Sequence, residues 1–226
     1  REALRLTGIE SGVEITTIAD IPGQGTGLGS SSSVTVGLLN AMHAFQGREV
    51  SKEQLAEEAC QIEIDTLGAP IGRQDQYAAS FGGVNSIRFG ENGVQVEPIE
   101  VSEGLSKKFS ENFTLVFTGL TRSASKVLSE QSDDESDKNS RMAEIRKHAD
   151  EAASHIEHGD LDSLGAILNQ TWISKRGVSS MVTNTQIDDL YERVISSGAL
   201  GAKLLGAGNG GFLLVCGNRQ LRGILQ

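Results

Sequence analysis

Two clusters of glycine constrain this chain more than any other feature of its sequence. The first lies within Pro22 to Ser33, where glycine alternates with other residues and leads into a run of serines, and the second spans Gly206 to Gly211. Glycine makes up 27 of the 226 residues, about 12 per cent against a usual share of roughly 7 per cent. Because glycine has no Cβ, we predict two sites where backbone closely approaches another group.

Charge and cysteine content exclude several classes of protein. The formal net charge is −10, which argues against a nucleic-acid partner because such proteins present basic surface to phosphate. Cys60 and Cys216 stand alone, as in a reducing cytosol. The chain has no apolar run of 18 residues and no signal peptide. We therefore expect a soluble cytoplasmic protein with no nucleic-acid or membrane partner, and the oligomeric state stays open, a homodimer included.

Both ends of the sequence look cut. The chain begins at Arg1 without an initiator methionine and stops at Gln226, shortly after an apolar run. We expect a fragment of a longer protein.

The first half reads as a strand, the glycine loop and then helices. Apolar and β-branched residues alternate before the loop, apolar residues repeat at helical spacing after it, and Ser51 with Gln54 forms a capping box for a second helix. The expected elements are a strand over 12–21, a helix over 34–45, a helix from residue 52, a short helix near 74–79, and strands over 84–89 and 94–101.

A new strand at 113–117 suggests a boundary, so we predict domains over 1–112 and 113–226. The acidic stretch 129–139 lacks apolar anchors and predicts a mobile loop. The remaining expected elements are helices over 140–158, 160–169 and 186–197 and strands over 199–205 and 212–216.

The first glycine cluster is placed to hold an anion. It follows an expected strand and opens an expected helix, whose free N–H groups and dipole favour negative charge, while the serines add donors. A flexible linker followed by serine caps is the alternative interpretation. The pattern contains no Walker lysine, does not match G-x-G-x-x-G, and fails G-x-S-x-G because Ser33 replaces the second glycine.

The second cluster does satisfy G-x-G-x-x-G. An expected strand follows it, however, where a dinucleotide site requires a helix. We therefore do not interpret it as a dinucleotide site.

Phosphoryl transfer needs a phosphate cradle, a metal held by an acid or hydroxyl, and a group that orients the attacking hydroxyl. Glu63 closes the helix after the capping box, and Asp75 follows a glycine-bracketed loop. Taken alone, each acid is also compatible with a purely structural role.

Three segments together resemble the GHMP kinases, the family of galactokinase, homoserine kinase and mevalonate kinase. Pro22 to Ser33 resembles their central motif, P-x-x-x-G-L-G-S-S, and Gly201 to Phe212 resembles their third motif. Ile71 to Tyr77 resembles the segment that carries the catalytic aspartate, with Glu63 twelve residues before Asp75. The resemblance implies an α+β fold of two lobes, an N-terminal lobe like domain 2 of ribosomal protein S5, lacking the family's first motif, and a ferredoxin-like C-terminal lobe.

The resemblance also implies ATP and Mg²⁺ as cofactors. Asp75 would orient or deprotonate the acceptor hydroxyl, Ser31 and Glu63 would hold Mg²⁺, and the second loop would lie against the first loop and the substrate. The implied phosphate-binding residues are Gly25, Gly27, Leu28, Gly29, Ser30, Ser31 and Ser32, and the implied substrate-adjacent loop is Gly206, Ala207, Gly208, Asn209 and Gly210.

Within the family, the serine-rich loop and Gly82 to Asn85 resemble the D-glycero-D-manno-heptose 7-phosphate kinases, which implies phosphorylation of an anomeric hydroxyl. Galactokinase-like or fucokinase-like action on an unphosphorylated sugar is the alternative, as is a non-catalytic homologue that senses sugar or ATP. A non-nucleotide anion-binding module is a third class. The chain departs from the family pattern in a loop one residue longer after Pro22 and in Asn209, which interrupts a glycine run.

Several other residues carry weaker hypotheses. His148, His155 and His158 suggest a metal site, although solvated helix histidines are the commoner case. Trp172 and Lys175 could line a substrate pocket, unless the tryptophan belongs to the core. Arg122 and Lys126 are similar candidates.

Overall fold

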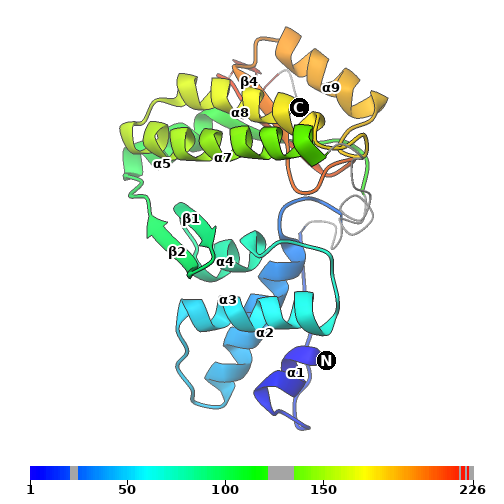
Figure 1. Cartoon of the computed structure of the whole chain (residues 1–226). Helices are drawn as coiled ribbons and strands as arrows, with labels where there is room; N and C mark the ends of the chain where they lie inside the picture. The colour runs from blue at the N-terminus through cyan, green and yellow to red at the C-terminus, as the bar shows by residue number, and fades with distance from the viewer. Residues whose placement is uncertain (21–24, 122–134, 219, 222, 224–226) are drawn as a thin grey trace.

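The apolar pattern divides the chain into two lobes, each with its own core (Figure 1). The computed structural model describes residues 1–20, 25–121, 135–218, 220, 221 and 223. Within these residues no helix is both long enough and apolar enough to cross a membrane. The lobes meet at the two glycine loops and at an ion pair between Arg88 and Asp150, whose Nη2 and Oδ1 atoms lie 2.9 Å apart.

The lower lobe in Figure 1 is a layer of helices with a small hairpin beside it. Leu39, Ala56 and Ala59 are fully buried at the contacts between its helices. The hairpin strands pair antiparallel, with Ile87 opposite Val96. In chain order the elements are α1 (Glu2–Thr7), α2 (Ser30–Phe45), α3 (Lys52–Cys60), the π-helical turn η1 (Gln61–Thr66), α4 (Gln74–Phe81), β1 (Asn85–Gly90) and β2 (Gly93–Pro98).

The predicted start of α3 at Ser51 is confirmed. Ser51 caps α3, because its side chain accepts a hydrogen bond from the backbone N–H of Gln54 at 3.1 Å. The helix then widens into η1, which carries Glu63. Single π-turns within helices are frequent at functional sites.

The upper lobe places helices over a three-stranded antiparallel sheet of order β3-β5-β4. Helix α8 lies close on β4 because both carry a glycine there: a Cβ on Gly201 would clash with the carbonyl oxygen of Gly165. Trp172 and Ile187 are fully buried in this core. The elements are α5 (Glu103–Asn112), β3 (Phe113–Phe117), α7 (Glu135–His158), α8 (Leu161–Arg176), α9 (Thr185–Ser196), β4 (Gly201–Leu204) and β5 (Phe212–Cys216).

The strand predicted over 12–21 is wrong for the residues that the structure describes. Residues 13–19 have no regular structure, and Ile18 is 92% exposed. A strand needs a neighbour for its backbone hydrogen bonds, and no described strand pairs with this segment. The alternating pattern therefore indicates residues suited to a strand, but it does not show whether a neighbouring strand is present to pair with them.

The sequence interpretation also missed two helices and misplaced a third. Helix α1 was not predicted, and α7 begins at Glu135, inside the predicted acidic loop, whose residues 129–134 lie outside the described residues. Helix α5 was not predicted because its sequence is mostly polar. A capping signal was nevertheless present, since the Ser102 side chain accepts a hydrogen bond from Leu105 N at 3.2 Å. Phe109 of α5 packs on Phe113 of β3, with ring centroids 5.4 Å apart.

The domain boundary at residue 113 stays a prediction. Helix α5 lies before that residue but packs against β3. We therefore propose that the second lobe begins before α5 instead of at residue 113.

Candidate active site

The two glycine loops touch backbone to backbone. A Cβ on Gly27 would lie 2.6 Å from the carbonyl oxygen of Leu205, and a Cβ on Gly206 would lie 2.5 Å from the Cα of Gly27. Across the same contact, Phe212 N donates to Thr26 O at 3.1 Å. The predicted proximity of the loops is confirmed. A flexible linker is excluded for Gly25 to Gly29, because this segment is packed against the upper lobe; Pro22 to Gln24 lie outside the described residues.

Asn209 fits the second loop despite interrupting its glycine run. Its φ of 57° is left-handed, a conformation that asparagine tolerates better than most residues. Its backbone N–H donates to Val182 O at 2.7 Å, and its side-chain oxygen accepts from Asn184 Nδ2 at 2.5 Å. Asn209 therefore fixes the loop to the segment before α9.

The first loop leads directly into α2, so the N-terminus of this helix lies beside the contact between the two glycine loops. Gly29 is the N-cap residue, with a left-handed φ of 68°, and no side chain caps the helix. The N–H groups of the first turn at Ser30, Ser31 and Ser32 have no intrahelical partner, and the helix dipole adds positive potential. This end of α2 can therefore bind an anion, although the roles of these serines stay a prediction.

Glu63 receives four hydrogen bonds from the surrounding elements. Ser31 Oγ and Thr35 Oγ1 donate to Oε1 at 2.6 and 3.1 Å, while Ser32 Oγ and Gln76 Nε2 donate to Oε2 at 2.7 and 2.5 Å. The glutamate is only 4% exposed. A buried charge requires such compensation, so these donors explain how the carboxylate is held inside the lobe.

Asp75 lies beside the first loop, in the first turn of α4. A Cβ on Gly29 would lie 3.4 Å from its Cγ. Burial raises the pKa of Asp75, a hydrogen bond with the Gln74 side chain lowers it, and the charge of Glu63 raises it again. The structure thus brings together both predicted acids and the loop predicted to bind phosphate.

The oxygen donors at this site suit magnesium. Mg²⁺ prefers carboxylate, hydroxyl, phosphate and water oxygens and seldom uses an all-protein cage. Ser31 is exposed and bonds to Glu63. The described residues contain no group of three acidic, histidine or cysteine side chains arranged to hold a metal. A bound cation would therefore need phosphate or water oxygens to complete its coordination.

A hollow of about 300 Å³ lies next to Asp75 in the chain, lined by Gly72, Arg73, Gln74 and Phe89. Arg73 is ion-paired with Glu57 and lies over the Tyr77 ring, 5.7 Å from its centroid. A positively charged side chain, already paired with Glu57, therefore lines this hollow.

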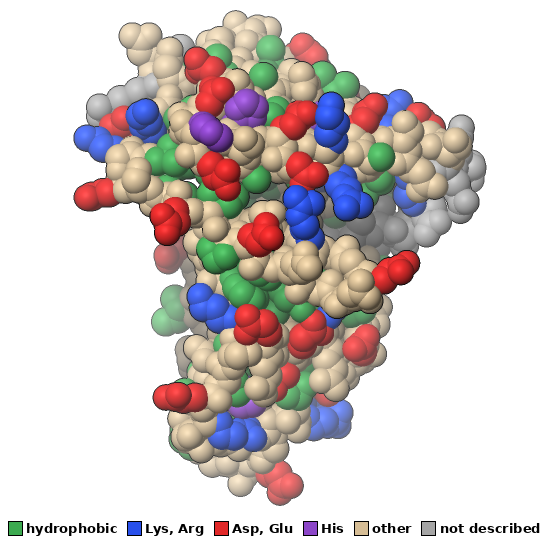
Figure 2. Space-filling model, turned by 60° about the vertical axis from the view of Figure 1, so that its left-hand side comes forward, with side chains coloured by type: hydrophobic (Ala, Val, Ile, Leu, Met, Phe, Trp, Pro, Cys, Tyr) green, Lys and Arg blue, Asp and Glu red, His purple; other side chains and the backbone are tan. Residues whose placement is uncertain are grey.

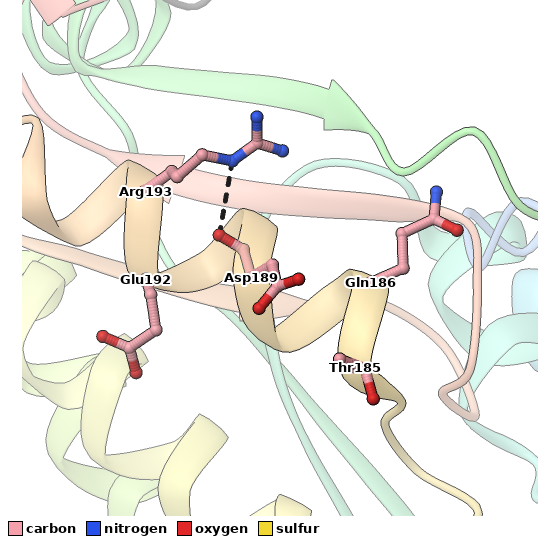
Figure 3. A pocket seen from close by; sticks show the side chains of 5 residues that line it. All are labelled: Thr185, Gln186, Asp189, Glu192 and Arg193. Carbon is pink, nitrogen blue, oxygen red and sulfur yellow. Dashed lines mark hydrogen bonds between the residues drawn. The ribbon is translucent and has the colours of Figure 1, made fainter.

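A larger hollow lies along α9 in the upper lobe. It measures about 830 Å³, and Figure 3 shows the residues that line it: Thr185, Gln186, Asp189, Glu192 and Arg193. None of them belongs to either glycine loop. Size alone therefore does not locate the candidate site; the meeting of the loops with the two acids does.

The weaker sequence hypotheses fare differently. Trp172 is fully buried core, whereas Lys175 donates to the carbonyl oxygen of Gly206 in the second loop. Burial, followed by the nearby charge of Lys203, lowers the pKa of Lys175 to about 7. The three α7 histidines form no metal cluster among the described residues, and Figure 2 shows acidic and basic side chains interspersed over the face it presents. Arg122 and Lys126 lie outside the described residues.

Sequence reasoning missed Thr35 and Gln76 as partners of Glu63. The available signal was the spacing of Ser31 and Thr35, which puts two hydroxyls on one face of a helix. Gln76 had no such signal, because its partner lies 13 residues away on a different helix.

Two family models match the chain. The GHMP kinases N terminal domain matches residues 1–83, and the GHMP kinases C terminal model matches residues 152–220. A D-glycero-alpha-D-manno-heptose 7-phosphate kinase from Campylobacter jejuni is 33% identical over 200 residues, which cover 87% of this chain and 59% of the relative. A mevalonate kinase from Aeropyrum pernix is 34% identical over 194 residues, covering 83% of this chain and 56% of the relative.

A solved structure of a D-glycero-D-manno-heptose 1-phosphate kinase from Bacteriodes thetaiotaomicron has the same fold. Its TM-score is 0.70 at 24% identity, covering 91% of this chain and 57% of that one. The chain spans less than two thirds of the length of each of these three proteins.

The raised pKa of Asp75 predicts a pH-dependent change in stability. The folded protein holds this proton more tightly than the unfolded chain, whose aspartate titrates near 3.8, so stability falls as pH rises through the interval between the two pKa values. Asp75→Asn should therefore be more stable than wild type at pH 7, with the difference vanishing below about pH 3.8. Urea unfolding at several pH values measures this.

Asp160→Asn is the matched control, because Ser163 donates to the Asp160 carboxylate and lowers its pKa. That substitution should give no stability gain at pH 7. An Asp75→Asn variant that is no more stable than wild type at pH 7 would contradict the burial of an ionised aspartate.

Proposed function

Because the chain belongs to the GHMP kinase family, we propose that it forms the ATP-binding and catalytic part of a sugar kinase. The observation that carries the proposal is the contact of the two glycine loops at the N-terminus of α2, with Glu63 and Asp75 beside it. A helix N-terminus binds phosphate through free N–H groups. The acids add the metal-binding and hydroxyl-orienting groups that phosphoryl transfer requires.

In the proposed reaction a sugar hydroxyl attacks the γ-phosphorus of ATP. The new O–P bond forms as the bond to the β-phosphate oxygen breaks, ADP leaves, and Asp75 accepts or orients the hydroxyl proton. The N–H groups of Ser30 to Ser32 bind phosphate oxygens. Ser31 and Glu63 would hold Mg²⁺, which would neutralise charge on the phosphates.

For the acceptor we propose the anomeric hydroxyl of D-glycero-D-manno-heptose 7-phosphate. The Campylobacter relative supports this choice, and so does Arg73, which lines a hollow and stands two residues before Asp75 in the chain. Arginine binds phosphate through a fork of N–H donors. A substrate phosphate would replace or share the Glu57 carboxylate that pairs with Arg73, whereas an unphosphorylated sugar has no group that could do so.

The test of the kinase proposal is ADP release by the full-length protein with Mg-ATP. The acceptors are heptose 7-phosphate, galactose, fucose and, because of the Aeropyrum relative, mevalonate. We expect turnover that is highest with heptose 7-phosphate. Asp75→Asn should lower kcat by roughly 10²- to 10⁴-fold, the usual contribution of an acid–base group, with nucleotide affinity largely retained.

Other outcomes would replace this proposal. Unchanged turnover in Asp75→Asn would remove the catalytic role of Asp75. Tight ATP binding without turnover on any acceptor would favour a sensing homologue, and the absence of Mg-ATP protection against thermal unfolding would favour a simple anion-binding module.

The proposed role of Arg73 predicts a change in acceptor selectivity. Losing a charge-assisted hydrogen bond costs about 1.5–3 kcal/mol, so Arg73→Met should raise KM for heptose 7-phosphate by roughly 10- to 100-fold. Turnover of unphosphorylated sugars should not change. Steady-state kinetics with both acceptors measures the difference.

Arg5→Met is the control, since the Arg5 side chain is 66% exposed and is likewise ion-paired, with Glu2 inside α1 and away from the site. Equal effects of Arg73→Met on phosphorylated and unphosphorylated acceptors would count against a phosphate contact.

A further inference from the structure

We propose that the two oxygens of the Glu63 carboxylate have different roles, and that Gln76 is the positioning residue that separates them. Gln76 and Ser32 fix Oε2 within the lobe, which leaves Oε1 as the oxygen available to a divalent cation beside Ser31. The inference rests on the proposed function for the reaction, but its principal test is cation binding.

The Oε2 edge is held by two buried donors. Gln76 Nε2 lies 2.5 Å from Oε2 and Ser32 Oγ lies 2.7 Å from it. Gln76 is 0% exposed and Ser32 is 2% exposed. A carboxylate can only accept, so the amide must turn its nitrogen toward Glu63. Breaking either bond would leave a polar group buried without a partner.

The Oε1 edge is held by donors that can be released. Thr35 Oγ1 lies 3.1 Å from Oε1 and also 3.1 Å from the carbonyl oxygen of Ser31. A threonine hydroxyl has one proton, so it can donate to the carbonyl when Oε1 is engaged elsewhere. Ser31 is exposed, and its hydroxyl oxygen keeps lone pairs for a cation.

The unpaired atom of Gln76 supports a fixed orientation. Its Oε1 atom is buried without a hydrogen-bond partner, whereas its Nε2 atom contacts Glu63. Buried side-chain oxygens are rarely left unpaired in folded proteins. The Gln76 side chain is therefore oriented by the hydrogen bond from its Nε2 to Glu63 Oε2, and its own Oε1 makes no hydrogen bond.

The position of Glu63 on η1 fits the same role. The π-helical turn follows α3 directly and aims the carboxylate at α2 and α4 rather than at solvent. Groups behind a metal ligand orient it and tune its affinity, and their loss typically weakens metal binding or activity by 10- to 100-fold.

Two variants give opposite expectations for the two edges. In the full-length protein with a non-hydrolysable ATP analogue, Mn²⁺ binding is measured by electron paramagnetic resonance of the free ion. We expect Gln76→Leu to weaken Mn²⁺ binding by roughly 10- to 100-fold. Thr35→Val, which removes a competing donor from Oε1, should leave the affinity unchanged or increase it.

Kinetics provide a second readout. Gln76→Leu should raise the Mg²⁺ concentration needed for half-maximal turnover by a similar factor, with KM for the acceptor unchanged. Gln54→Leu is the matched control, because Gln54 Nε2 donates to Glu58 Oε1 at 2.8 Å on an exposed helix surface outside the site. It should change neither quantity.

Each contrary result overturns the proposal. Equal weakening by Gln76→Leu and Thr35→Val would show that the two edges do not differ. Unchanged Mn²⁺ affinity in Gln76→Leu, with only a lower unfolding midpoint in EDTA, would assign Gln76 a purely structural role. If Gln76→Leu does not fold, Gln76→Asn withdraws the amide from Oε2 by one methylene and serves the same test.

Failure of the kinase proposal gives a separate signature. Suppose that the wild-type protein binds Mn²⁺ with the nucleotide analogue, and that Gln76→Leu weakens this binding while Thr35→Val does not. If no acceptor is then turned over, the positioning role of Gln76 stands and the kinase activity does not. Wild-type protein that binds no Mn²⁺ under these conditions would overturn the positioning role itself.

Discussion

The candidate site depends on a contact that only glycine permits. Gly27 lies against Leu205 and Gly206 so closely that a Cβ on either glycine would overlap backbone atoms. This contact joins the lobes where the chain enters α2, so it determines where the free N–H groups of that helix point. The same contact explains Gly27, Gly206 and Gly211, whereas Gly208 and Gly210 closely approach Val182 and Leu120 instead.

The two acids differ in how their buried carboxyl groups are compensated. Glu63 is buried but fully hydrogen-bonded, whereas Asp75 is raised in pKa by burial and receives only partial compensation from Gln74. Perturbed carboxylates with a nearby charge partner are typical of functional sites. Lys175 donates to Gly206 O in the second loop, and burial followed by the nearby charge of Lys203 lowers its pKa to about 7. The arrangement concentrates ionisable groups around one backbone junction.

Much of this architecture follows from local sequence patterns, and the rest depends on contacts between distant residues. The α+β fold of two lobes and the family resemblance are confirmed, and the Ser51 N-cap and the strand 113–117 form as predicted. The strand over 12–21 failed because a pattern cannot supply a pairing partner. The polar helix α5 was missed because its stability comes from Ser102 and from packing on β3. Gln76 was missed because its partner comes from another helix.

The most direct test of the central claim is nucleotide binding by a variant that separates the loops. Calorimetric titration with a magnesium complex of a non-hydrolysable ATP analogue would compare wild type, Gly27→Ala and Gly47→Ala. Both glycines have a left-handed φ, 72° and 71°, but a Cβ on Gly47 has no atom within 4 Å whereas one on Gly27 meets Leu205. The account predicts at least a roughly tenfold loss of affinity for Gly27→Ala, about 1.4 kcal/mol, and little change for Gly47→Ala. Wild-type affinity in Gly27→Ala would contradict it.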